Sequence, residues 1–366
     1  MEFLLAELCE QVMTANAARR PVFIRGGGTK SFYGASRLHA EPDSHAVLDV
    51  SNYAGVVHYE PSELALTARA GTLLSDIERT LDEQGQMLAF EPPRFGAAST
   101  LGGCVAAGLS GPRRMTAGPL RDYVLGTRLL DSSGSVLRFG GEVMKNVAGY
   151  DVSRLLAGSM GIFGLVLEVS LRVVPKPLRE ATLVFEMPQV EALERFGVWR
   201  GRPLPISATA WVAQGAASGR LWVRLSGNDA AVVQAVSQLG GQVAEDSLAC
   251  AFWRSLRDQT HESFSGRPLW RVAVPPGTPP LAHGATRLME WSGGQRWLFD
   301  VDSGAALRQS VQQAAGHATL YRYETAAPDV PVFHPLPSAL LAISQRLKRE
   351  LDPAGIFNPK RLFPDF

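Results

Sequence analysis

Residues 21–34 read PVFIRGGGTKSFYG, and this stretch is the most informative one in the chain. The apolar run of residues 21–24 ends in Arg25 and three successive glycines. A short apolar run that is bounded by such residues predicts a buried strand. Glycines are costly to order and pack no side chain, so three of them after a strand favour a backbone whose N–H groups hold an anion. A flexible turn between strands is the alternative interpretation.

Two well-known phosphate loops do not fit this stretch. A Walker loop requires Gly-Lys-Ser/Thr at its end, but Gly28 is followed by Thr29, which displaces Lys30. A dinucleotide fingerprint requires the pattern GxGxxG. Gly26 and Gly28 satisfy its first two positions, whereas Ser31 occupies the last one. The loop therefore belongs to neither class.

The composition predicts a globular protein of two or three domains. The chain has 366 residues, of which 46% are apolar and 19% are charged, and its formal net charge is +1. This charge, and the lack of a basic block in the sequence, give no reason to expect nucleic acid as a partner.

The compartment is predicted from the N-terminus and the cysteines. The first twelve residues, MEFLLAELCEQV, predict an amphipathic helix rather than a signal peptide, and no run has the length of a membrane span. Cys9, Cys104 and Cys250 are too far apart for a disulfide framework or a CxxC metal site. We therefore expect a cytoplasmic protein without a metal, and peripheral attachment to the inner membrane through a partner stays open.

The apolar patterns predict an α+β protein whose first domain covers residues 1–177. Thr72 or Ser75 is expected to cap a helix that stops at Gly85. Residues 165–174 (LVLEVSLRVV) alternate apolar and polar side chains, which predicts a strand with one solvated face. The other elements expected in this domain are a helix over 1–20 and strands over 47–50, 64–69, 123–130 and 136–139.

Prolines at 175 and 177 mark the predicted end of the first domain. Residues 178–330 predict a smaller antiparallel sheet with helices on one face, built from two related halves with an irregular stretch between them. Residues 331–366 are expected to return to the first domain. The elements expected after the boundary are strands over 182–186, 207–212, 220–225, 286–291, 295–301 and 317–323, and helices over 190–199, 230–239, 305–315 and 338–351.

Two further glycine-rich segments lie in the first domain. In the first, Ser99 or Thr100 is a natural helix N-cap, and the turn that follows contains only small residues, so an anion could lie against its N–H groups. Taken alone, this segment favours the other interpretation, close packing of the helix on a sheet. In the second, glycines at 158, 161 and 164 predict a flat slot lined by backbone, or else a bulged loop at a sheet edge. Three such segments in one domain favour a long ligand with a phosphate and a flat ring.

Four motifs in order give the chain a resemblance to a known family. The segments IRGGGTK, STLGGCVAAG and GYDVSRLLAGSMGIFGLV resemble the FAD-binding domain of the vanillyl-alcohol oxidase type, and DPAGIFNPKRLFP resembles the C-terminal signature of its FAD-linked oxidase branch. Within that branch, the short length and WSGGQRWL make the chain most similar to the FAD-binding subunits of bacterial glycolate oxidases. The resemblance implies a two-lobed FAD-binding domain with a smaller cap domain.

The resemblance also implies a cofactor, its contacts and its partners. Some relatives attach FAD covalently through a histidine after the glycine loop; Thr29 stands there, so we expect non-covalent FAD. The implied partners are a larger flavin subunit, an iron–sulfur subunit and a small 2-hydroxy acid. The positions expected to contact FAD are Arg25, Gly26, Gly27, Gly28, Thr29, Pro93, Ser99, Thr100, Gly102, Gly103, Gly158, Ser159, Gly161, Ile162 and Val166.

The chain departs from the family where the substrate would react. Catalytic subunits of this branch carry a His-Gly-Asp-Gly-Asn-x-His run, which this sequence lacks, and Met160 stands where an acidic residue is usual. The catalytic residues are therefore unassigned, with Arg296, Tyr150 and Lys145 as candidates that also have ordinary structural interpretations. The resemblance implies oxidation of glycolate to glyoxylate with electrons passed to the iron–sulfur subunit. A relay or assembly subunit with structural FAD is the alternative, and a nicotinamide-dependent reductase ranks last.

Overall fold

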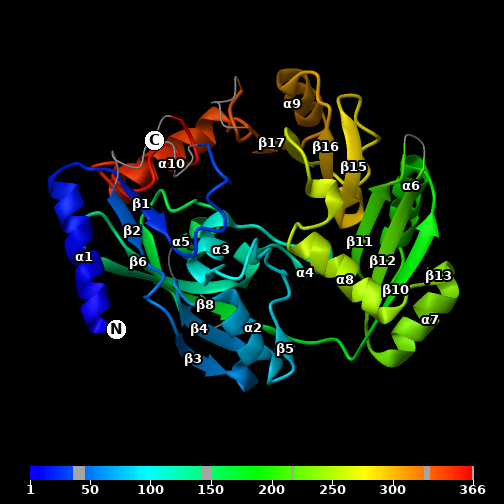
Figure 1. Ribbon diagram of the computed structural model, residues 1–366, viewed down its shortest axis with the longest axis horizontal. Helices are drawn as coiled ribbons and strands as arrows, with labels where there is room; N and C mark the ends of the chain where they lie inside the picture. The colour runs from blue at the N-terminus through cyan, green and yellow to red at the C-terminus, as the bar shows by residue number, and fades with distance from the viewer. Residues whose placement is uncertain (36–45, 142–150, 216–217, 325–329, 365–366) are drawn as a thin grey trace. The chain divides into compact units, whose positions relative to one another are not determined.

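The computed structural model describes residues 1–35, 46–141, 151–215, 218–324 and 330–364. Its contacts divide the chain into two compact units. Unit 1 consists of Met1–Leu109, Pro119–Pro175 and Pro335–Phe366, and unit 2 consists of Ser110–Gly118 and Lys176–His334. The expected boundaries, after residues 177 and 330, lie close to these, but the short insertion from unit 2 near residue 114 has no counterpart in the expected division. An α+β architecture is confirmed (Figure 1).

The first lobe of unit 1 is a parallel pair of strands covered by the N-terminal helix. Strands β1 and β2 pair in register from Val22 opposite Ala46 to Arg25 opposite Asp49. Buried side chains of the helix, Leu8 among them, pack on these strands together with Phe357 from the end of the chain. The expected helix and strands are present, with bounds α1 (Glu2–Ala17), β1 (Val22–Arg25) and β2 (Ala46–Asp49).

The second lobe of unit 1 is a five-stranded antiparallel sheet in the order β3-β4-β8-β6-β7. The expectation of a solvated face on the strand after residue 164 is wrong, because seven of the eight residues of β8 are buried. Glu168 accounts for part of the polar pattern: it is buried and pairs with Arg128 at 2.9 Å. The strands are β3 (Val56–Glu60), β4 (Ala65–Arg69), β6 (Val124–Leu130), β7 (Val136–Gly140) and β8 (Leu165–Arg172), with a separate pair β5 (Gln86–Met87) and β9 (Val174–Pro175).

The helices of unit 1 are short except at the two ends of the chain. The expected cap of α2 is wrong: the helix begins after Leu73 without a side-chain cap, and Thr72 instead bonds to the backbone of Gly55. Thr100 caps α3 as expected, through a 3.4 Å bond from the Gly103 N–H. The helices are α2 (Leu74–Asp82), α3 (Leu101–Ala107), α5 (Val152–Leu156) and α10 (Ser338–Leu351), with 3-10 turns at Pro61–Glu63 and Leu120–Tyr123.

Unit 2 is built on one eight-stranded antiparallel sheet in the order β13-β10-β12-β11-β15-β16-β14-β17. The pairing of β11 with β15 joins the two halves that the sequence predicts. The strands are β10 (Arg179–Glu186), β11 (Ile206–Ala213), β12 (Gly219–Gly227), β13 (Gln242–Val243), β14 (Leu269–Ala273), β15 (Ala285–Glu290), β16 (Gln295–Phe299) and β17 (His317–Arg322).

The helices of unit 2 do not all lie on one face of its sheet, so that expectation is wrong. Helices α6 and α7 pack in one core with Leu183. Helix α8 instead contacts the neighbouring Thr182, to which Trp253 donates at 3.0 Å, and successive strand residues point to opposite faces. The helices are α4 (Arg114–Ala117), α6 (Gln189–Arg200), α7 (Asp229–Leu239), α8 (Asp246–Arg257) and α9 (Gly304–Gln313), with 3-10 turns at Glu262–Phe264 and Trp291–Gly293.

Candidate functional site

The glycine run after β1 presents bare backbone to a pocket in unit 1. A Cβ on Gly26 would lie 2.3 Å from the Thr100 hydroxyl oxygen, and one on Gly27 would lie 1.5 Å from the carbonyl oxygen of Ala98. Gly28 has a φ of +67°, and open space lies where its Cβ would be. Among the residues described, none accepts a hydrogen bond from the N–H groups of these three glycines. Adjacent N–H groups without protein acceptors form the cradle that an anionic phosphate needs.

Helix α3 forms a wall of this pocket rather than a second set of donors. The N–H groups of Leu101 and Gly102 bond to the carbonyl oxygens of Thr72 and Ala70 at 2.9 and 2.8 Å. Gly103 is the third residue of this turn, and its N–H goes to the capping hydroxyl. The first turn is thus satisfied within the protein, and its small residues allow close approach instead.

Some residues of the third glycine segment line the pocket, and others pack against helix α3. Gly161 lines the pocket and Val166 does too, whereas Gly158 faces helix α3, where its N–H donates to Val105 at 2.9 Å. A Cβ on Gly108 would lie 2.7 Å from the Gly158 Cα, so this pair of glycines lets two backbones touch.

Ten of the expected contact positions line the pocket and five do not. Those that line it are Arg25, Gly26, Gly27, Gly28, Thr29, Thr100, Gly102, Gly103, Gly161 and Val166. Those outside its lining are Pro93, Ser99, Gly158, Ser159 and Ile162. The assignment of these positions to a ligand stays a prediction.

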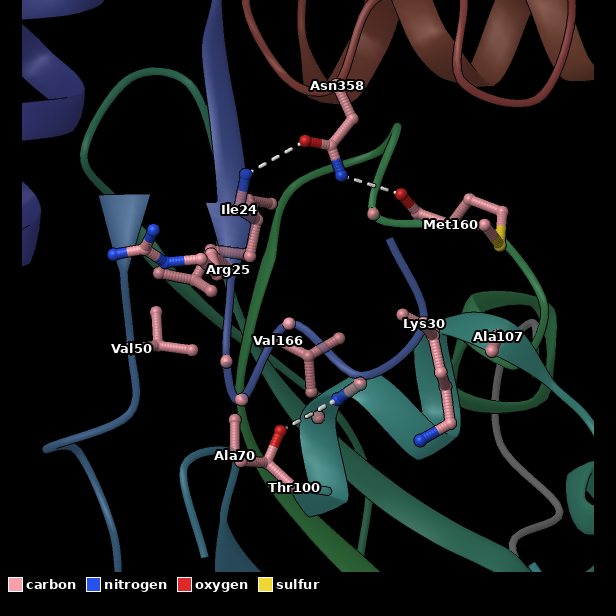
Figure 2. A pocket seen from close by; sticks show the side chains of 18 of the residues that line it. Ile24, Arg25, Lys30, Val50, Ala70, Thr100, Ala107, Met160, Val166 and Asn358 are labelled. Carbon is pink, nitrogen blue, oxygen red and sulfur yellow. Dashed lines mark hydrogen bonds between the residues drawn. The ribbon is translucent and has the colours of Figure 1, made fainter. Parts of the chain in front are cut away.

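The end of the chain contributes a residue that the sequence did not reveal as part of the site. Asn358 accepts a hydrogen bond from the Ile24 N–H at 2.9 Å and donates one to the Met160 carbonyl at 2.7 Å (Figure 2). It therefore ties the end of β1, just before the glycine run, to the third glycine segment. Arg361, also in the lining, donates to the carbonyl oxygens of Lys30 and Ser31 at 3.2 and 3.1 Å.

Two cationic side chains border the pocket from positions close to the glycine run. Lys30 is 9% exposed, and its ammonium group donates to the Ser99 hydroxyl at 2.6 Å and lies 5.5 Å from the centroid of the Phe95 ring. Nearby, burial raises the pKa of Cys104 to about 11, against the opposing effect of Lys30. Arg25 turns its guanidinium toward Asp49, at 2.8 Å. A buried ammonium group and the N–H cradle both favour an anionic ligand.

The candidate catalytic residues are not assembled by the described part of the structure. Arg296 is fully buried, and among the described residues it donates only to the backbone carbonyl groups of Gly293, Pro279 and Thr278. These contacts indicate a structural role, and a catalytic role of Arg296 stays a prediction. Tyr150 and Lys145 lie outside the described residues.

Comparison with known proteins identifies the family. The FAD binding domain family matches residues 5–140. The glycolate oxidase subunit GlcE of Escherichia coli strain K12 is 40% identical over 359 residues, which cover 98% of this chain and 97% of that protein. The chain belongs to the GlcE family of glycolate oxidase subunits.

Other similarities of this GlcE-family chain are more distant. The glycolate oxidase subunit GlcD of Bacillus subtilis strain 168 is 30% identical over 174 residues, which cover 48% of this chain and 36% of that one. A solved structure of alkyldihydroxyacetonephosphate synthase superposes with a TM-score of 0.64 over 98% of this chain and 76% of that one. Its sequence identity is 15%, so it shows the fold alone.

The family and the pocket agree on FAD as the cofactor. The cradle of N–H groups fits a pyrophosphate. Gly161 lines the same pocket, and a Cβ there would lie 2.7 Å from the Asn358 amide nitrogen, so this glycine makes room for Asn358. The GlcE-family chain is therefore an FAD-binding oxidoreductase subunit. No helix in the described ranges is long and apolar enough to cross a membrane.

Proposed function

We propose that this chain is the FAD-binding subunit of a glycolate (2-hydroxy-acid) dehydrogenase complex that oxidises glycolate to glyoxylate. A larger flavin subunit and an iron–sulfur subunit complete the complex in this proposal, and the electrons leave through the iron–sulfur subunit. The end-to-end similarity to the GlcE subunit of E. coli glycolate oxidase is the observation that carries it.

Different residues of unit 1 would hold different parts of the cofactor. The N–H groups of Gly26, Gly27 and Gly28 would take the pyrophosphate, and the buried Lys30 adds positive charge beside them. The backbone of Gly161 and the side chain of Val166 line the same pocket and would contact the rest of the cofactor. Bound FAD supplies acceptance of a hydride and release of single electrons. The protein contributes orientation and exclusion of water.

We propose that the cofactor is held without a covalent bond, because Thr29 occupies the position after the glycine run. Acid precipitation of the purified chain should then release all flavin into the supernatant. Yellow colour that stays with the pellet would contradict this.

The proposal is tested by mixing the purified chain, with and without its partner subunits, with glycolate under anaerobic conditions. Bleaching of this chain's own flavin on adding glycolate supports it. A flavin that stays oxidised even in the assembled complex, while the complex turns over glycolate, would overturn the role of this flavin as hydride acceptor.

A second candidate function is electron relay or assembly with FAD bound structurally. The observation that favours it is the missing His-Gly-Asp-Gly-Asn-x-His run, which supports substrate chemistry on the larger flavin subunit in this alternative. An artificial electron acceptor added to the isolated chain separates the two. Glycolate turnover without partners would eliminate the relay function.

A further inference from the structure

One face of the unit 2 sheet brings an arginine and a histidine together from neighbouring strands. In the pairing of β14 with β17, Arg271 lies opposite Thr319 and Ala273 lies opposite His317. Residues two apart on a strand share a face, so Arg271 and His317 are diagonal neighbours on one face. Diagonal pairs across antiparallel strands are about 7–8 Å apart, within reach of one small ligand.

Arg271 is held from one side and open on the other. Its Nε donates to the Gln295 Oε1 at 2.7 Å, and Gln295 is fixed in turn by donating to Glu290 at 2.9 Å. Trp297 donates to the same Glu290 oxygen at 2.7 Å, so this carboxylate is committed within the sheet. Within the described part of the chain, the two terminal nitrogens of Arg271 have no acceptor. The guanidinium is thus oriented with its bidentate edge available.

A second arginine, Arg114, lies near Arg271, because both guanidinium groups contact the ring of Trp291. The guanidinium carbons of Arg114 and Arg271 lie 4.5 and 5.4 Å from the centroid of the Trp291 ring. This ring is buried and donates to the Gly111 carbonyl at 3.0 Å. Trp291 and Ser292 both have positive φ, +54° and +53°, a conformation that costs free energy and is commonly retained at functional sites.

His317 completes the group as a neutral side chain. Desolvation, followed by the charges of Arg271, His334 and Arg114, lowers its pKa to about 4. The side chain nevertheless keeps access to solvent, and its ring makes no hydrogen bond to any residue in the described ranges. At neutral pH it therefore presents one nitrogen that can accept a hydrogen bond and one that can donate.

We propose that Arg271, Arg114 and His317 form a binding site in unit 2 for a small carboxylate, of the 2-hydroxy or 2-oxo acid class. The open edge of Arg271 takes the carboxylate, Arg114 adds charge beside it, and the imidazole of His317 accepts a hydrogen bond from the adjacent hydroxyl group. The choice of a 2-hydroxy acid rests on the proposed function. Binding of an oxyanion at this place stands on the geometry alone.

Calorimetric titration of the full-length chain with oxalate tests the site, because oxalate has no hydrogen to give to a flavin. We expect saturable binding of oxalate, and none of ethylene glycol, which has the same size without carboxylates. Arg271→Gln should weaken oxalate binding about tenfold or more, since charge-assisted hydrogen bonds are lost. Arg271→Lys should recover part of it. Arg220→Gln, on β12 of the same sheet, removes a partly exposed arginine paired with Glu186 and should leave binding unchanged.

Further binding measurements test the class of ligand and the role of His317. Inorganic phosphate that binds as tightly as oxalate would overturn the assignment to carboxylates. His317→Leu should weaken glycolate more than oxalate, because only glycolate has a hydroxyl group for the imidazole. Equal binding of oxalate by wild type and Arg271→Gln would overturn the site. Since oxalate binding needs no flavin chemistry, its failure is distinct from failure of glycolate to bleach the flavin.

Discussion

Asn358 shows how one side chain can define the cofactor pocket. Its amide carries an acceptor and a donor on one planar group, so it accepts from the Ile24 N–H and donates to the Met160 carbonyl in one orientation. Its φ of +40° is a backbone conformation that Asn and Asp adopt more easily than most residues. We therefore regard it as a positioning residue for the glycine run and the third glycine segment.

Asn358→Asp is the most discriminating change at this position, because aspartate keeps the acceptor and the backbone conformation but loses the donor. We expect FAD to dissociate about tenfold more readily, since a buried hydrogen bond is worth about 1–3 kcal/mol when its partner is left unsatisfied. Recovery of flavin fluorescence on dilution measures this. Asn52→Asp, at an exposed position of the same unit, is the matched control. Equal FAD affinity in both variants would refute the role of Asn358.

The lowered pKa of His317 predicts how the stability of the chain changes with pH. Its folded pKa of about 4 lies below the value of about 6.5 expected in the unfolded chain. Between these values the unfolded chain binds the proton that the folded chain resists, so stability falls as the pH falls from about 6.5 toward 4. His317→Leu should therefore lose less of its thermal midpoint between pH 7 and pH 5 than wild type does. His58→Leu, in unit 1, is the comparison, and an unchanged pH dependence in His317→Leu would contradict the assignment.

Glycine runs were visible in the sequence because they are contiguous, whereas the role of Asn358 was not. The residues that it contacts are 334 and 198 positions away, and no local pattern encodes such a pairing. The prediction of free N–H donors at the start of α3 is wrong for a related reason. The carbonyl groups that satisfy Leu101 and Gly102 come from Thr72 and Ala70, on another element.

At the scale of elements, the periodicity of apolar residues predicts most strands and helices. One helix that was not predicted nevertheless has a clear helical pattern in the sequence. Helix α8 buries Ala249, Phe252, Trp253 and Leu256, which is the spacing of a helix with one apolar face. It lies in the stretch that we expected to be irregular. The buried polar face of β8 could not be predicted, because Glu168 looks solvated until its partner Arg128 is known.

The end of helix α10 is an element held by a buried ion pair. Lys348 donates to Asp352 at 2.6 Å and to the carbonyl groups of Ile162 and Phe357 at 2.6 and 3.0 Å. Desolvation lowers the pKa of Lys348, and Asp352 opposes that shift. The pair thereby connects the C-terminal helix to the segment that follows Gly161.

Lys348→Met should destabilise the chain by about 3–5 kcal/mol, because it leaves the buried Asp352 carboxylate without its cation. The double variant Lys348→Met with Asp352→Asn should recover part of this loss, since no unpaired charge remains. Urea unfolding of both variants gives the coupling free energy. Arg349→Met, the exposed neighbour on the same helix, should change stability by less than about 0.5 kcal/mol. Equal losses in single and double variants would show that the pairing does not matter.

At the scale of the whole molecule, unit 1 is assembled from three separate stretches of the chain. The pocket collects its lining from the glycine run, from α3, from the segment before β8 and from Asn358 and Arg361 at the end. The sequence predicted the return of the last residues to the first domain through the resemblance of DPAGIFNPKRLFP to a C-terminal signature, not through any physical pattern. What the signature does becomes evident only when its contacts are known.

A chain that stops after His334 tests whether the pocket needs the C-terminal segment. It keeps every residue of unit 2 and the glycine run, but it loses α10, Asn358 and Arg361. The N–H groups of residues 26–28 would then lack the clamp that orients them, and the hydrophobic contacts of Phe357 with β1 would be lost. We expect this chain to purify without flavin and to bind none when FAD is supplied in excess, as judged by visible absorbance. A truncated chain that is yellow would show that the glycine run suffices by itself and that the C-terminal segment serves another purpose.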